Sequence, residues 1–179
     1  MPAARYLLPV LILLAVAAAR PAIAASELPA AVAKQIAKDY PGARILRRSN
    51  LSRLCEAVPD EAGGIMSADF DGDGNDDYAV LVNLGRSKEK PEPGETLFDV
   101  ALVAFMAAKG GGYRRIELDR YEGFTLAFWL REEPEGELLD EQRRETVTIP
   151  NAGIYVDYCG GGAVHYWQGG KFHDVEVSG

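Results

Sequence analysis

The spacing of apolar positions predicts one helix near the start of the chain. Val32, Ile36 and Tyr40 recur every four residues, which is the spacing of one helical face. Pro41 and Gly42 follow and end the pattern. A helix of this length is not stable by itself in water. We therefore expect an amphipathic helix that lies on an apolar surface.

Beyond this helix, short apolar or alternating segments separated by turn residues predict β-strands. The segment 97–107 is almost wholly apolar, which is typical of a central strand buried on both faces. Gly169 and Gly170 separate the last two segments by two residues, which is a strong hairpin signal. The other expected strand segments are 43–46, 65–70, 78–84, 113–118, 124–130, 146–149, 153–158, 163–168 and 171–177.

Two segments rich in charged residues are expected outside the strands. Residues 85–96 combine Pro, Gly, Lys and Glu and predict an exposed loop. Residues 131–145 are mostly charged and predict a solvated loop or a frayed helix. The predicted fold class is therefore α+β, with one N-terminal helix packed on a mostly antiparallel sheet of about seven or eight strands.

The N-terminus has the pattern of a secretory signal peptide. Arg5 precedes an uncharged run from Tyr6 to Ala19, and Ala22 and Ala24 are small residues where a signal peptidase cleaves. The run is shorter than the roughly 20 residues that a membrane-spanning helix needs. We therefore expect a signal peptide over residues 1–24, and a single domain over residues 25–179 that is periplasmic or secreted.

The charge of the chain disfavours some classes of partner. The sequence has 19 Lys and Arg against 27 Asp and Glu, a net charge of −8. The predicted signal peptide holds two of the arginines and no acid, so the mature charge is 17 minus 27, or −10. Nucleic acids and anionic lipid surfaces attract basic proteins. We expect a protein partner, no nucleic acid and no membrane insertion after cleavage.

The two cysteines, Cys55 and Cys159, both belong to the expected mature chain. Because an exported protein meets an oxidising environment, we expect them to form one disulfide. A bond that closes a loop of about 100 residues contributes roughly 4–5 kcal/mol in chain-entropy models.

The most specific motif is an acidic loop between two expected strands. Asp69, Asp71, Asp73 and Asp77 supply carboxylates at alternating positions, and Asn75 is placed to offer its main-chain carbonyl. Calcium prefers six to eight oxygen ligands, and the glycines of the loop permit the sharp turn that brings such ligands together. The sequence therefore predicts a calcium site.

The full string from Ala68 to Val80 resembles the calcium loop of FG-GAP and VCBS-type repeats, as found in integrin alpha-chain propellers. It does not fit an EF-hand, which needs an acidic residue at position 12 of the loop, where this chain has Val80. The resemblance covers about residues 66–83 and implies a hairpin stapled by calcium. It implies these ligands: Asp69, Asp71, Asp73, Asp77 and the carbonyl of Asn75.

Outside this loop, the residues give weak signals for chemistry. His165 and His173 lie in neighbouring expected strands and could bind zinc together with Asp174. Ordinary strand histidines are favoured, because the spacing motifs of zinc sites are absent.

The sequence therefore predicts an exported, non-enzymatic, calcium-stabilised binding protein, of which an inhibitor or immunity-type protein is the more specific form. One alternative is a metal-dependent hydrolase of the cell envelope that uses the loop aspartates or the His165 and His173 pair. Another is an adhesive or structural accessory protein of the envelope, an interpretation that rests on the repeat resemblance alone.

Overall fold

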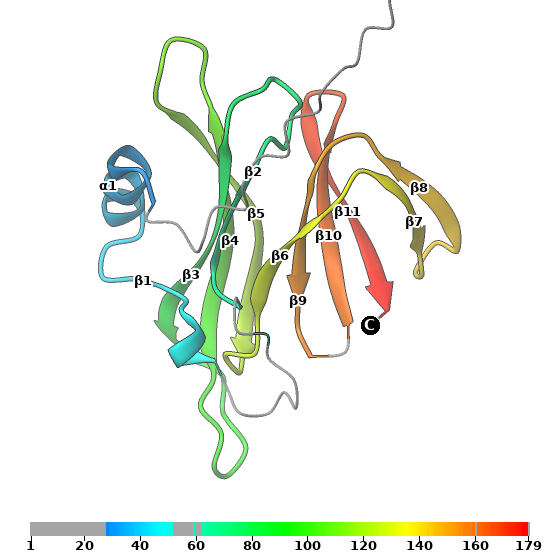
Figure 1. The fold of residues 1–179 in the computed structure, drawn as a ribbon. Helices are drawn as coiled ribbons and strands as arrows, with labels where there is room; N and C mark the ends of the chain where they lie inside the picture. The colour runs from blue at the N-terminus through cyan, green and yellow to red at the C-terminus, as the bar shows by residue number, and fades with distance from the viewer. Residues whose placement is uncertain (1–27, 52–58, 60–61, 160, 179) are drawn as a thin grey trace, which may run out of the picture.

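A computed structural model describes residues 28–51, 59, 62–159 and 161–178, so the predicted signal peptide lies outside the described residues. Within them are one α-helix, one 3-10 helix and eleven strands (Figure 1). Their bounds are α1 Ala30–Asp39, β1 Arg44–Ile45, η1 Arg48–Asn50, β2 Ile65–Ala68, β3 Asp77–Arg86, β4 Phe98–Ala107, β5 Tyr113–Phe124, β6 Trp129–Glu133, β7 Gly136–Asp140, β8 Glu145–Ile149, β9 Gly153–Asp157, β10 Gly161–Gln168 and β11 Lys171–Ser178. No helix in this part of the chain is long and apolar enough to cross a bilayer.

The strands form three antiparallel sheets. Sheet A has the order β1-β3-β4-β5, with β2 also paired to β3, and sheet B has the order β11-β10-β9-β6. Strands β7 and β8 form a separate hairpin. The predicted α+β fold with one sheet of seven or eight strands is therefore wrong. The protein is mostly β, because the apolar segments divide between sheets that cover one another.

The main core lies between sheets A and B. It includes Phe70, Leu102, Phe128 and Ile154, and each of these side chains is buried. The next residue of β4, Val103, points to the opposite face of sheet A and belongs to a second core. The prediction that segment 97–107 is a strand buried on both faces is confirmed, because β4 supplies side chains to both cores.

The second core lies between α1 and the outer face of sheet A. Val32, Ile36 and Tyr40 are buried there against Val80 and Val103, among other residues. The predicted amphipathic helix is thus confirmed, and the three residues spaced four apart form its buried face. The helix covers part of one sheet, and it is a small addition to a β-structure (Figure 1).

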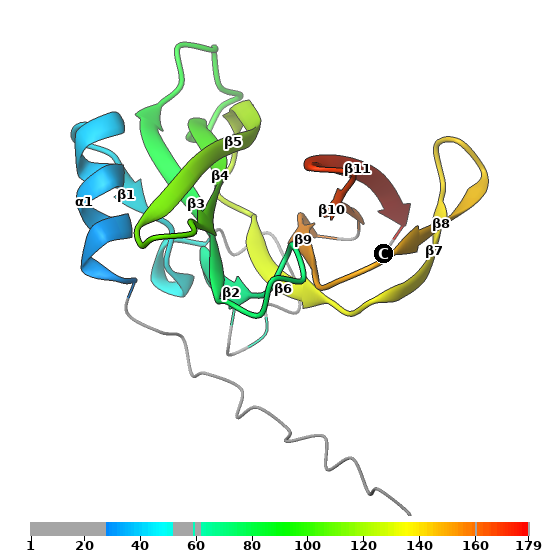
Figure 2. The same cartoon turned by 90° about the horizontal axis from the view of Figure 1, so that it is seen from above.

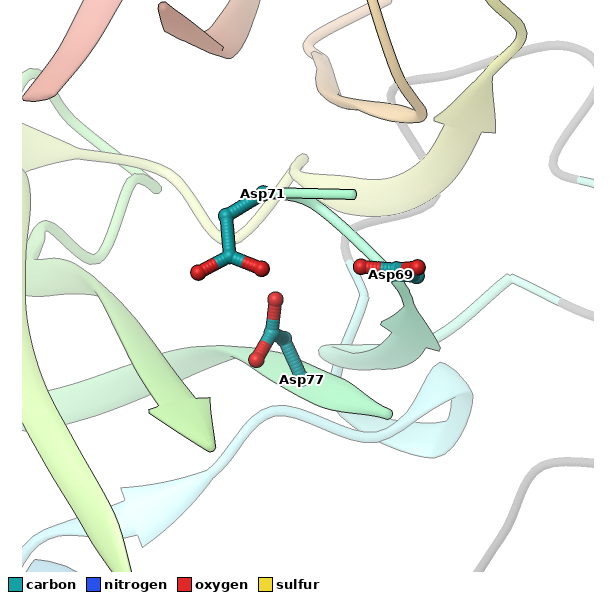
Figure 3. A group of neighbouring side chains, drawn as sticks. All are labelled: Asp69, Asp71 and Asp77. Carbon is teal, nitrogen blue, oxygen red and sulfur yellow. The ribbon is translucent and has the colours of Figure 1, made fainter. Parts of the chain in front are cut away.

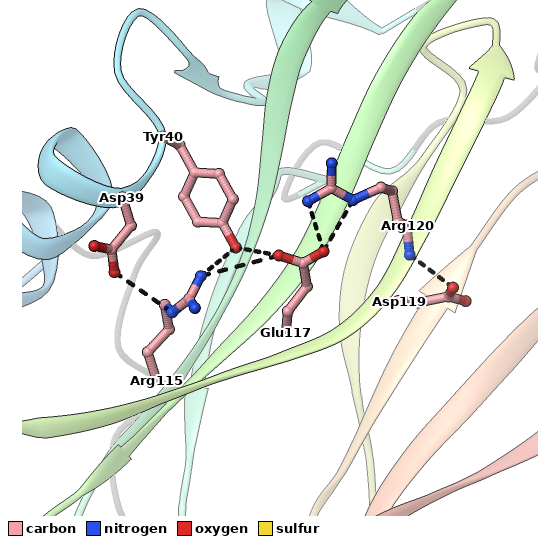
Figure 4. A network of polar contacts seen from close by, with 6 residues as sticks. All are labelled: Asp39, Tyr40, Arg115, Glu117, Asp119 and Arg120. Atoms are coloured by element: carbon pink, nitrogen blue, oxygen red, sulfur yellow. Dashed lines mark hydrogen bonds and ion pairs between the residues drawn. The ribbon is translucent and has the colours of Figure 1, made fainter.

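A polar network fastens the end of α1 to the edge strand β5 (Figure 4). The Tyr40 hydroxyl donates a hydrogen bond to Glu117 at 2.6 Å and accepts one from Arg115 at 2.8 Å. Arg115 also pairs with Asp39 at 3.4 Å, and Arg120 pairs with Glu117 at 2.7 Å. Burial, followed by the neighbouring Glu117 carboxylate, raises the pKa of Tyr40 to about 12.

Residues 131–145, expected as a loop or frayed helix, contain the end of β6, all of β7 and the start of β8. That prediction is wrong. Leu138 and Val147 are directly paired across the hairpin. They pack with Ile149 on the outer face of sheet B, against Tyr155 and Val164 among other residues. The hairpin forms because it shields this second apolar face of sheet B, although charged residues dominate its sequence.

Candidate metal centre

The acidic loop connects β2 to β3, which pair antiparallel from Ala68 and Asp77 outward. Asp69 organises the turn, because its carboxylate accepts hydrogen bonds from the main-chain N–H groups of Gly72, Asp73 and Gly74 at 2.8–3.0 Å. Gly72 and Gly74 have φ of 76° and 88°, a conformation that residues with a Cβ adopt with strain. The predicted hairpin with an acidic turn is therefore present.

Three carboxylates of the loop come together. Ligand oxygens of Asp69, Asp71 and Asp77 all lie within 4.8 Å of one another, and we call these residues the Asp triad. Figure 3 shows the carboxylates of Asp71 and Asp77 facing each other, with Asp69 beside them. Among the described residues, this is the one group of three or more His, Cys, Asp or Glu side chains close enough to hold a metal ion.

The fourth predicted carboxylate does not join this group. Asp73 is exposed and is not part of the Asp triad. Its Oδ1 accepts hydrogen bonds from the main-chain N–H and the side-chain amide of Asn75, each at 2.9 Å. The structure thus brings together three of the four predicted carboxylates.

Asp77 is the buried member of the Asp triad, with no exposed surface. Its two oxygens accept hydrogen bonds from the main-chain N–H groups of Phe70 at 3.0 Å and Ala107 at 2.7 Å. It therefore ties the loop to the end of β4. Burial raises the pKa of Asp77 to about 6; the two N–H groups oppose this, and the carboxylates of Asp71 and Asp69 add to it.

The residues present fit a hard metal cation. The Asp triad offers carboxylate oxygens, which are the donors that calcium and magnesium prefer. Three carboxylates this close repel one another, and a bound cation would replace that repulsion with attraction. The Asp triad can therefore hold a metal ion, which would also lower the cost of keeping Asp77 ionised in the interior.

A residue that belongs to no recognised motif also touches the loop. Asn151, between β8 and β9, donates a hydrogen bond from Nδ2 to the main-chain carbonyl of Phe70 at 3.3 Å. Its Oδ1 lies so near Gly72 that a Cβ there would be 2.7 Å away. Phe70 itself is fully buried and packs edge-on against Phe172 of β11. The loop is thus held by both sheets, through contacts between residues far apart in the chain.

The two histidines do not form a zinc pair. His165 lies opposite Asp174, whereas His173 lies opposite Tyr166. They are therefore one position out of register and point to opposite faces of sheet B. His173 stacks on Tyr166 with ring centroids 5.4 Å apart. Burial lowers the pKa of His165, which favours its neutral form.

Cys159 lies in the turn between β9 and β10 with a positive φ of 64°. Its predicted partner Cys55 lies outside the described residues, so the disulfide between them stays a prediction. Comparisons of this chain with protein-family models, with curated proteins and with solved structures find no match.

Proposed function

We propose that this chain is an exported, non-enzymatic binding protein that calcium stabilises, of the inhibitor or immunity type. The observation that carries the calcium proposal is the Asp triad, which places three carboxylates around one point on a hairpin. The acidic charge of the chain carries the proposal of a protein partner, because such a surface attracts basic proteins and repels nucleic acids.

Calcium is favoured over magnesium by the character of the donors. Calcium accepts six to eight oxygens in flexible geometry, whereas magnesium demands a near-ideal octahedron and keeps several waters. The loop offers three carboxylates, from Asp69, Asp71 and Asp77, whereas magnesium is usually bound through one or two. With these donors, water molecules would complete the coordination of a calcium ion.

The proposed role of calcium is to stabilise the fold. The Asp triad flanks Phe70, which lies in the core between the sheets, and Asp77 joins the loop to β4. An ion bound here would order the acidic loop, which contacts strands of both sheets. At a free calcium concentration of about ten times Kd, binding adds roughly 1.4 kcal/mol to the free energy of unfolding.

Three experiments test the proposal. Calorimetric titration of the mature chain with calcium should give one site, with weaker heat from magnesium; the absence of binding would overturn the metal assignment. Affinity capture from an envelope extract should return a stoichiometric protein partner. Recovery of no partner, together with turnover of a glycan or peptide substrate, would overturn the binding role. Mass analysis of the exported chain should show cleavage after Ala24.

A further inference from the structure

Sheets A and B meet along one side and stay apart along the other. Gly63, just before β2, pairs with Leu130 of β6, which joins the sheets at that side. On the opposite side are the edge strands β5 and β11, and no strand of the described chain joins them (Figure 2). We call the side-chain layer between β5 and β11 the open edge.

At one end of the open edge, an arginine of this chain contacts an aromatic ring of the opposite sheet. The guanidinium of Arg114, on β5, lies over the ring of Trp167, on β10, at 5.2 Å. Trp167 in turn contacts Phe172 of β11, with ring centroids 5.1 Å apart. A basic side chain on aromatic rings is therefore what spans the sheets at this end.

The other end of the open edge carries an aromatic cluster: Tyr121, Phe124, Phe128 and Tyr158. Tyr121 lies 4.9 Å from Phe128 and 6.2 Å from Phe124, and Phe128 lies 6.4 Å from Tyr158. Phe124 is 49% exposed, so one ring of the cluster faces solvent. The cation–π contacts of the described residues fall on Trp167, Tyr40 and Tyr155. None of them falls on this cluster.

Carboxylates accompany these rings from both edge strands. Asp119 of β5 pairs with Leu102, which places it on the side of sheet A that faces sheet B. Glu176 of β11 accepts a hydrogen bond from the Tyr158 hydroxyl at 2.8 Å. Both carboxylates are exposed. Burial is the largest cause of the raised pKa values of Tyr121 and Tyr158, and the carboxylates of Asp119 and Glu176 raise both values further.

One buried polar atom on this side of sheet B, Nε2 of His165, has no hydrogen-bond partner within the described residues. Burial lowers the pKa of His165, and the carboxylates of Asp119, Asp174 and Glu176 oppose this effect. This end of the open edge thus combines electron-rich rings with negative charge, and both favour a cation.

We propose that this end of the open edge binds a lysine or arginine side chain of a protein partner. The cationic group lies between the carboxylates of Asp119 and Glu176, and its aliphatic stem packs on Phe124 and the adjoining rings. This arrangement repeats, with a partner's residue, the contact that Arg114 makes with Trp167 at the opposite end. The inference rests on the proposed function as a binding protein, and it names the group that the partner presents.

A divalent metal does not fit this place. Asp119, Glu176 and His165 do not form a cluster with metal-ligand spacing, since the Asp triad is the one such cluster in the described residues. An anionic ligand would meet two exposed carboxylates with like charge. A monovalent cation on an apolar stem satisfies both the carboxylates and the rings.

The test is a titration of the isotope-labelled mature chain with the peptide Gly-Lys-Gly-Lys-Gly amide, followed by NMR in millimolar calcium. Amide shifts should centre on residues 119–128 and on Tyr158 and Glu176. The same peptide with glutamate in place of lysine should cause none. Phe124→Ser should weaken binding about threefold, because one exposed cation–π contact is lost. Glu176→Gln should weaken it about fivefold, as loss of one partly exposed charge pair does.

Leu139→Ser is the matched control. Among the described residues, Leu139 is the other large apolar side chain with about half of its surface exposed, at 52%, and it lies on β7, whose Leu138 packs on the outer face of sheet B. It should leave peptide binding unchanged. Equal weakening by Leu139→Ser, shifts centred on the Asp triad, or no shifts at millimolar peptide would overturn the inference. The calcium-induced rise in melting temperature, measured on the same variants, reports on the proposed metal site independently, so failure of one proposal can be told from failure of the other.

Discussion

The replacement Asp71→Asn is predicted to stabilise the metal-free protein and to lose most or all of that gain when calcium is bound. Asp71 is the least constrained member of the Asp triad: it is half-buried, and its Oδ1 accepts one hydrogen bond, from the Asp73 N–H at 3.2 Å. An asparagine keeps an oxygen that can accept this bond and removes the charge. The variant therefore isolates the electrostatic contribution of one carboxylate.

The size of the effect follows from the geometry. The ligand oxygens of the Asp triad are at most 4.8 Å apart. Two unit charges at this distance repel by about 0.9 kcal/mol at the dielectric constant of water. Asp71 has two such neighbours, Asp69 and Asp77, so its neutralisation should stabilise the metal-free protein by about 1–2 kcal/mol at low salt. With calcium, the variant loses a charged ligand. If its affinity falls about tenfold, the calcium contribution drops from about 1.4 to about 0.4 kcal/mol.

The assay is urea unfolding of the oxidised mature chain in chelator and in calcium, at one fixed ionic strength. The control is Asp73→Asn, which removes the same charge from an exposed residue outside the Asp triad and should change stability little in either condition. Equal destabilisation of Asp71→Asn in chelator and in calcium would refute the reasoning. The negative charge of Asp71 would then stabilise the loop without an ion.

Three further predictions concern the fold. Tyr40→Phe should lower the free energy of unfolding by about 1 kcal/mol in chemical denaturation, because the hydrogen bonds with Glu117 and Arg115 are lost; an unchanged value would mean that apolar packing alone holds α1. Phe105→Ala, at a fully buried position, should cost about 3–5 kcal/mol, whereas the same change at the half-exposed Phe124 should cost less than about 1 kcal/mol; similar losses at both sites would contradict the packing described. Unfolded His165 takes up protons below its ordinary pKa of 6.5, whereas burial lowers the pKa in the native state, so stability falls as the pH is lowered below 6.5. His165→Leu should remove this part of the pH dependence, and parallel curves of unfolding free energy against pH for the two proteins would exclude it.

Sequence reasoning succeeded where structure depends on neighbours along the chain. The four-residue spacing of α1, the Gly169-Gly170 hairpin and the acidic turn at Asp69 are local patterns, and all three are present. The continuous apolar run of β4 also indicated burial on both faces. Each of these features can be read within about a dozen residues.

The rest depends on contacts between distant residues. Nothing near β7 and β8 shows that their few apolar side chains meet a second face of sheet B. Alternating patterns fix which face of a strand is buried, but they do not tell which sheet the strand joins. The contact of Asn151 with the acidic loop has the same origin, since it joins residues 81 positions apart. The candidate metal site was therefore predicted as a local loop, without its attachment to sheet B.

The order of strands has a consequence for how the protein folds. Strands β3, β4 and β5 follow one another along both the chain and sheet A, as β9, β10 and β11 do in sheet B. Pairings between consecutive strands close short loops and form early, whereas contacts across long loops form late. Each three-strand unit can thus assemble on its own contacts before the two meet. The joining of Gly63 to Leu130 and of Asn151 to the acidic loop then belongs to a late, slower docking step. Until that step the apolar face of β4 stays uncovered, and in this interval the chain is most exposed to aggregation.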